Sequence, residues 1–257
     1  MTVPSTLLDL GLTLRPEHDG ERQRHIAHLA ARLGFRYVWL PVSASVAGPD
    51  VAALVERARP AQVGLIITGD LPAVVERVAD LSTGGLAPDV LLEVHAPVEA
   101  REQLVTAVGG LGRWRQRVLV PWHDMEAAGL VVLAEGAGDR ATVEAALTEA
   151  VSRRRARGHD HARFPISVAL TVSIGRTMSE AAARALRDPA LSGDHDPRRA
   201  GLFGTLEHAQ EQALRLARAG ADAVRATLAD EQDVADLLAQ LRAVAVGPTP
   251  VLHARRR

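Results

Sequence analysis

The sequence contains no cysteine, no lysine and no asparagine among its 257 residues. The absence of cysteine excludes disulfide bonds, a thiolate nucleophile and any zinc or iron–sulfur centre held by cysteine. The absence of lysine excludes catalysis through a Schiff base. Anions must therefore be bound by arginine, histidine or backbone N–H groups.

Charge of one sign is not in excess, because 30 basic residues stand against 31 acidic ones and the formal net charge is -1. This balance gives no overall field that would attract nucleic acid or an anionic membrane. No apolar run is long enough to span a bilayer, and the first residues lack the basic-then-apolar layout of a signal peptide. We therefore expect a cytoplasmic protein that binds neither nucleic acid nor membranes.

Eight short apolar segments recur along the chain, and amphipathic helical patterns separate most of them. Continuous apolar runs of this length are typical of strands that are buried on both faces, as in parallel sheets. The predicted strands are Leu8–Leu14, Phe35–Leu40, Val63–Thr68, Val90–Val94, Val118–Val120, Leu130–Leu133, Ile166–Ile174 and Ala223–Leu228.

Helices are predicted between these strands. Asp19 can cap a first helix that Gly34 ends, and Asp230 can cap the last helix. The helical patterns between them cover Asp50–Ala58, Pro72–Leu81, Pro97–Val108, Asp139–Arg157, Thr177–Leu186 and Thr205–Ala219.

Strands that alternate with helices in this way close most economically into a (βα)8 TIM barrel. We predict one barrel domain over residues 1–247 and a disordered tail over residues 248–257. An open, doubly wound sheet is the competing architecture. That fold would be expected to carry Gly-x-Gly-x-x-Gly after its first strand, and Leu10–Arg15 contains no such motif.

Several longer segments occur in an informative order. They are Ala30–Pro41, Gln62–Gly64 followed by Leu71–Gly85, Ala128–Leu133 leading into Asp139–Gly158, and Gly204–Glu207 followed by Gly220–Asp222. Together they resemble the luciferase-like monooxygenases, a family of flavin- and deazaflavin-dependent (βα)8 oxidoreductases. The resemblance implies FMN or a deazaflavin coenzyme in the barrel mouth, redox activity on a small organic substrate, and a homodimer formed through the barrel helices.

The chain departs from the family at three places, one of them being the fourth strand, where Leu92–Pro97 and a single helix stand in place of a glycine-rich turn and a long insertion. It resembles a member with shortened loops. After the second strand the family often carries an Asp-His or Glu-His pair, where this chain has Pro41–Ser45. A helix that holds the cofactor phosphate is replaced by the short segment Trp122–Ala127. Loss of that helix removes an N-terminus that would attract phosphate.

Functional groups of a (βα)8 barrel lie at the carboxyl ends of its strands, which places Arg15, Glu17 and His18 at the mouth after the first strand. Glu93 and His95 are two residues apart on one strand, so their side chains face the same way and can share a proton. The alternative is that one of them fills the barrel interior with a satisfied hydrogen bond. Trp122 can stack on a planar ligand and His123 can act as a general acid or base, or Trp122 can simply pack on a helix beside a solvated His123.

The candidate site residues divide into three groups, and no metal site is predicted because the histidine and aspartate clusters lack supporting ligands. The catalytic candidates are Glu93, His95 and His123. The cofactor-binding candidates are Thr68, Trp122, Gly136, Gly138, Arg176 and Arg225, with the glycines and arginines placed to hold phosphate. The substrate-binding candidates are Thr13, Trp39 and Ser43.

Three functions stay open at this point. The first is a flavin- or deazaflavin-dependent oxidoreductase. The second is a barrel without a cofactor that carries out acid–base chemistry, as an isomerase, cyclase or lyase. The third is a non-catalytic subunit that packs against an active relative through its barrel helices.

Overall fold

Strands from the two ends of the chain pair with each other in the computed structural model, which describes residues 8–42, 48–68, 70–83, 90–95, 118–121, 130–133, 140–158, 165–187, 196–199, 201–230 and 232–246. Leu10 of the first strand pairs with Val224 of the last, in parallel. The sheet is also joined between Val132 and Ser167. These two pairings close the strands into a ring, so the open doubly wound sheet is excluded.

Nine parallel strands form this sheet, in the order β6-β5-β4-β3-β2-β1-β9-β7-β8, with β6 also paired to β7. They are β1 (Asp9–Thr13), β2 (Tyr37–Val42), β3 (Gln62–Thr68), β4 (Leu91–His95), β5 (Val118–Pro121), β6 (Leu130–Leu133), β7 (Ile166–Ile174), β8 (Leu202–Gly204) and β9 (Ala223–Leu228). All eight predicted strands are present and make up the ring. The sequence prediction missed β8, which pairs with the end of β7.

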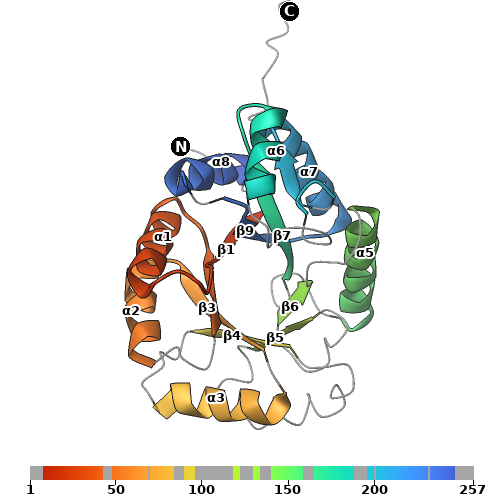
Figure 1. Cartoon of the computed structure of the whole chain (residues 1–257). Coiled ribbons are helices and arrows are strands. Elements are labelled where there is room, and N and C mark those ends of the chain that lie inside the picture. Colours follow the sequence, from red (N-terminus) through yellow and green to blue (C-terminus); the bar gives the residue numbers. More distant parts are fainter. Residues whose placement is uncertain are drawn as a thin grey trace, which may run out of the picture.

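Helices surround the ring, and α8 lies beside α1 where the chain closes on itself (Figure 1). In the described residues they are α1 (Gly20–Arg32), α2 (Gly48–Ala58), α3 (Leu71–Thr83), α5 (Arg140–Ala156), α6 (Met178–Arg187), α7 (Leu206–Ala219) and α8 (Val234–Val246). The helix predicted at Pro97–Val108 and the tail at 248–257 lie outside the described residues. None of the described helices is long and apolar enough to cross a membrane.

Two caps show how well local patterns predict helix ends. The Asp19 side chain accepts the N–H of Arg22 at 2.8 Å, so the predicted cap of α1 is confirmed. The predicted cap by Asp230 is wrong, because α8 begins only at Val234. The Asp230 carboxylate instead binds Arg187 and the backbone N–H of Gln232.

Side chains alternate between two cores. Outward-facing residues such as Leu65, Leu92 and Val168 pack against the helices in one large apolar cluster. Inward-facing residues form a smaller cluster around Trp39 and Leu91. The alternation follows from strand geometry, and it explains why the strands are apolar almost throughout: both of their faces are covered.

Two of the turns that follow helices use glycine in the left-handed region. Gly158 follows α5 at φ +68°, and a Cβ atom there would meet nothing within 4 Å. Gly220 follows α7 at φ +107°, and a Cβ atom there would lie 2.3 Å from Cγ2 of Val151. The two positions therefore share the backbone constraint but differ in packing.

We expect Gly220→Ala to destabilise the fold more than Gly158→Ala. Each substitution places an L side chain at positive φ, at a cost of about 1 kcal/mol. Gly220→Ala also forces Val151 away, which adds about 1–3 kcal/mol. Urea unfolding measures both free energies. Equal losses in the two variants would show that packing of α5 on this turn contributes nothing.

Candidate functional site

The carboxyl ends of β1, β7 and β9 present a wall of threonine side chains at the barrel mouth. Thr171 and Thr227 pair in register, and Thr13 follows the pairing of Leu12 with Ala226. Thr13 and Thr227 are partly exposed, whereas Thr171 is buried. The wall offers hydroxyl groups that can donate to or accept from a ligand. Thr13 is thus placed at the mouth, as its predicted role requires.

A buried ion pair crosses the barrel interior below these threonines. Nη1 of Arg225 on β9 donates to Oε2 of Glu93 on β4. Glu93 is 0% exposed and Arg225 is 7% exposed. The Nε atom of Arg225 is also buried and has no hydrogen-bond partner among the described residues. Two charges removed from water in this way depend on each other, because either one alone would be very costly to bury.

Trp39 lies against this pair and fills the rest of the layer. The guanidinium carbon of Arg225 is 5.3 Å from the centroid of the Trp39 ring, within the range of a cation–π contact. The ring also lies flat on β3, where a Cβ atom at Gly64 would be 2.2 Å from it. Trp39 is only 3% exposed and packs with Leu91. Together, Glu93, Arg225 and Trp39 form a layer that we call the barrel floor.

The barrel floor bears on three of the sequence-based candidates. The sequence left open that Glu93 or His95 fills the barrel interior with a satisfied hydrogen bond. Glu93 accepts such a hydrogen bond from Arg225. Arg225, predicted to hold cofactor phosphate, has Glu93 and Trp39 as its partners. Trp39, predicted to touch substrate, has Gly64 beneath its ring and Arg225 over it. The predicted ligand contacts of all three residues stay predictions.

The remaining candidates divide by position. Thr68 and His95 end β3 and β4 and pair in register, so the backbone places them side by side at the mouth. Arg176 follows β7 on the outer rim and lines a cavity of about 670 Å³ between α1, α6 and α8. Five candidates lie outside the described residues: Ser43, Trp122, His123, Gly136 and Gly138.

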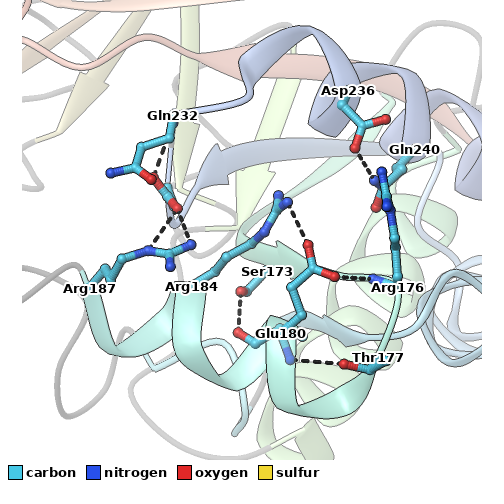
Figure 2. A network of polar contacts seen from close by, with 11 residues as sticks. Ser173, Arg176, Thr177, Glu180, Arg184, Arg187, Gln232, Asp236 and Gln240 are labelled. Carbon is cyan, nitrogen blue, oxygen red and sulfur yellow. Dashed lines mark hydrogen bonds and ion pairs between the residues drawn. The ribbon is translucent and has the colours of Figure 1, made fainter.

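A polar network fixes α6 on the rim (Figure 2). The Glu180 carboxylate accepts the N–H of Arg176 at 2.9 Å and Nη2 of Arg184 at 2.9 Å. These two contacts lower the pKa of the Glu180 carboxyl. At the other end of α6, Nε and Nη2 of Arg187 bind Oδ2 of Asp230 at 3.0 and 2.6 Å. Glu180 thus closes the first turn of α6, the hydroxyl of Ser173 on β7 donates to the carbonyl of Ala181, and Arg187 joins the other end of α6 to the loop after β9.

A second cavity, of about 330 Å³, lies between the carboxyl ends of β1 and β9. We call it the rim pocket, and it is lined by Arg15, Glu17, His18, Arg22, Arg187, Ala229, Asp230 and Gln232. Nη2 of Arg15 donates to the carbonyl of Leu228 at 2.5 Å, which links the two strand ends. Sequence reasoning placed Arg15, Glu17 and His18 at the mouth but missed Arg22 and Arg187. Arg22 carries one signal, since a basic residue in the first turn of a helix opposes the helix dipole.

His18 in the rim pocket is affected by both burial and nearby charges. Burial lowers the pKa of its imidazole below the ordinary value of 6.5, and the positive charge of Arg22 lowers it further. Nearby Glu17 and Asp19 act in the opposite direction without reversing the shift. The neutral imidazole is therefore the form that the fold favours.

No group of three or more His, Asp or Glu side chains in the described part of the chain is arranged to hold a metal ion. The described groups that could instead hold an organic cofactor are the threonine hydroxyls of the mouth and the arginines of the rim. Both kinds suit hydrogen bonding to a polar ring edge or to phosphate.

We expect Arg225→Met to destabilise the protein by about 3–5 kcal/mol, because it removes the guanidinium that donates to the buried Glu93 carboxylate. Adding Glu93→Leu to this variant also removes the buried negative charge, so we expect the double variant to recover much of the lost free energy of unfolding. A double-mutant cycle in urea gives the coupling energy. Additive losses would show that the two residues do not depend on each other.

We expect Arg22→Gln to raise the pKa of His18, because it removes the nearby positive charge. A lowered pKa means that the unfolded chain binds more protons between the folded value and 6.5, so stability rises with pH across that window. Arg22→Gln narrows this pH range, because it brings the folded-state pKa of His18 closer to 6.5. An NMR titration of the imidazole, assigned with His18→Gln, measures the shift. Arg32→Gln on the same helix is the matched control, and an equal shift in both variants would contradict a local effect.

Comparison with known proteins was informative only at the level of structure. No family model matches the sequence, and no curated protein matches it. Among solved structures, a coenzyme F420-dependent tetrahydromethanopterin reductase from Methanopyrus kandleri is 11% identical with a TM-score of 0.65, covering 91% of this chain and 97% of that one. An F420-dependent secondary alcohol dehydrogenase, solved with an F420-acetone adduct, is 14% identical with a TM-score of 0.69, covering 94% and 99%.

A monooxygenase shows the same likeness. The oxygenating constituent of 3,6-diketocamphane monooxygenase from Pseudomonas putida, solved with FMN, is 12% identical with a TM-score of 0.63, covering 93% of this chain and 97% of that one. The match thus extends over nearly the full length of each protein, with few identical residues. The chain has the (βα)8 barrel fold of the luciferase-like monooxygenases, as the order of its sequence segments predicts.

Proposed function

We propose that the protein is a flavin- or deazaflavin-dependent oxidoreductase that acts on a small organic substrate in the barrel mouth. One observation carries the proposal: the chain matches, over nearly its whole length, barrels that are described as dependent on coenzyme F420 or were solved with FMN. The partly exposed threonines at the mouth give it local support, because they can bind a polar ligand there. We further propose a cytoplasmic homodimer that forms through the barrel helices.

The barrel floor limits where the ligands can lie. The described interior side chains at the level of Trp39 are buried, so coenzyme and substrate would occupy the space above them, beside Thr13 and Thr227. When bound, FMN would supply hydride transfer or oxygen activation, and a deazaflavin would supply hydride transfer. The protein would hold the coenzyme against the substrate through Thr68, Trp122 and the glycines at 136 and 138. Ser43 would contact the substrate.

Proton transfer would fall to His95 or His123 in this proposal. Glu93 is bound by Arg225 in a fully buried position, so its carboxylate is engaged within the barrel floor. His95 ends β4 at the mouth, next to Thr68. An imidazole in such a position can donate or accept a proton near neutral pH.

We expect saturating FMN, or coenzyme F420, to raise the melting temperature of the protein. A ligand that binds only the folded state at about 100 times its Kd stabilises it by about 2.7 kcal/mol. Differential scanning fluorimetry measures the shift. Adenosine monophosphate is the control, since it carries a phosphate but no redox-active ring. If neither coenzyme raises the melting temperature above the value with adenosine monophosphate, the redox function is wrong and the cofactor-free enzyme takes its place.

A further inference from the structure

Phe203 is an aromatic residue on the short strand β8, which the sequence analysis missed. Its neighbour Leu202 faces outward, because it is buried in the apolar cluster beneath the helices. Successive side chains of a strand point to opposite faces, so Phe203 faces the barrel interior. Phe203 pairs in register with Ser173, which lies two residues beyond Thr171 on β7 and therefore on the same face. The ring of Phe203 thus lies beside the wall of threonines at the mouth.

The Phe203 side chain is partly exposed in this position. It belongs to neither of the two apolar clusters that the described residues form, and it is not among the side chains that pack against them. The hydroxyl of Ser173 beside it already donates to the carbonyl of Ala181 on α6 (Figure 2). The described ends of β7 and β8 therefore offer a ligand an aromatic surface in place of a hydroxyl.

The backbone that carries this ring is held by one side chain of α7. Oε1 of Gln212 accepts the N–H of Phe203 at 2.8 Å, and Nε2 of Gln212 donates to the Phe203 carbonyl at 3.2 Å. The carboxamide therefore pairs with the edge of β8 as a further strand would, and both polar groups of this residue are satisfied. Because the backbone at Phe203 is fixed before a ligand arrives, less conformational entropy is lost on binding.

We propose that Phe203 packs against the ring system of the coenzyme, an inference that rests on the proposed redox function. Flavin and deazaflavin rings are flat, with an apolar face for Phe203 and polar edges for the hydroxyls of Thr13 and Thr227. Thr13 and Phe203 lie on strands three steps apart in the order β1-β9-β7-β8, which separates them by about 14 Å. A tricyclic ring covers much of this distance, whereas a small substrate covers only part of it.

Fluorine NMR on the whole protein tests this contact directly. The chain has three phenylalanines, so labelling with 4-fluorophenylalanine gives three signals. Phe203→Leu and Phe35→Leu assign two of them. We expect saturating FMN, or coenzyme F420, to shift the Phe203 signal, because the ring current of a packed aromatic system acts over a short distance. The signal of Phe35, which is buried in the outer apolar cluster, is expected to stay unchanged.

Replacing the ring gives a second readout. We expect Phe203→Ala to bind the coenzyme about tenfold more weakly than the wild type in a calorimetric titration, because an aromatic contact is lost. Phe203→Tyr keeps the ring and is expected to retain the affinity. Leu186→Ala removes an apolar group that is 68% exposed on α6, and this matched control is expected to bind like the wild type. The melting temperature of each variant without ligand checks that the fold is retained.

The outcomes separate this contact from the redox function. Coenzyme binding that leaves the Phe203 signal unmoved, with equal affinity in Phe203→Ala, would overturn the contact and leave the redox function standing. Equal weakening in Phe203→Ala and Leu186→Ala would also overturn it, since the loss would then not be specific to the mouth. If neither FMN nor coenzyme F420 binds to the wild-type protein, the redox function is wrong and the contact is refuted with it.

Discussion

The ion pair between Glu93 and Arg225 is the contact on which the rest of the barrel interior depends. Both charges are removed from water, and their strands, β4 and β9, are not neighbours in the ring. The pair can exist only when the ring is closed and water is excluded, because a lone buried charge is strongly unfavourable. Trp39 completes the exclusion by covering Gly64 on one side and the guanidinium on the other.

The barrel floor separates the buried lower part of the barrel from the upper part, which a ligand can enter. Trp39 on β2 packs with Leu91 on β4, and its bulky ring lies against glycine on β1, at Gly11. Above them the described lining becomes smaller and more polar, with threonines on β1, β7 and β9. A ligand that enters from the carboxyl face therefore rests on the layer without displacing it. The packing of this layer therefore limits where a ligand can react, whichever side chains carry out the catalysis.

The sequence predicts the ring well because its signals are local. Each of the eight ring strands contains a short, mostly apolar run, and glycines mark the turns at 34 and 220 where helices give way to strands. The prediction failed where the deciding partner is distant or the segment is short. Asp230 is drawn from its expected cap by Arg187. Nothing within β9 indicates that Arg225 meets a carboxylate 132 residues away. The strand Leu202–Gly204 has too few residues to show a period.

The walls of the rim pocket come from opposite ends of the polypeptide. Arg15 and the carbonyl it holds at Leu228 are separated by 213 residues. No fragment that lacks either end can assemble this cavity, so any molecule seated there would recognise only the completely folded chain. Occupancy would then favour the closed ring over partly folded forms by mass action. A molecule that fits this cavity would therefore stabilise the finished fold and not its fragments.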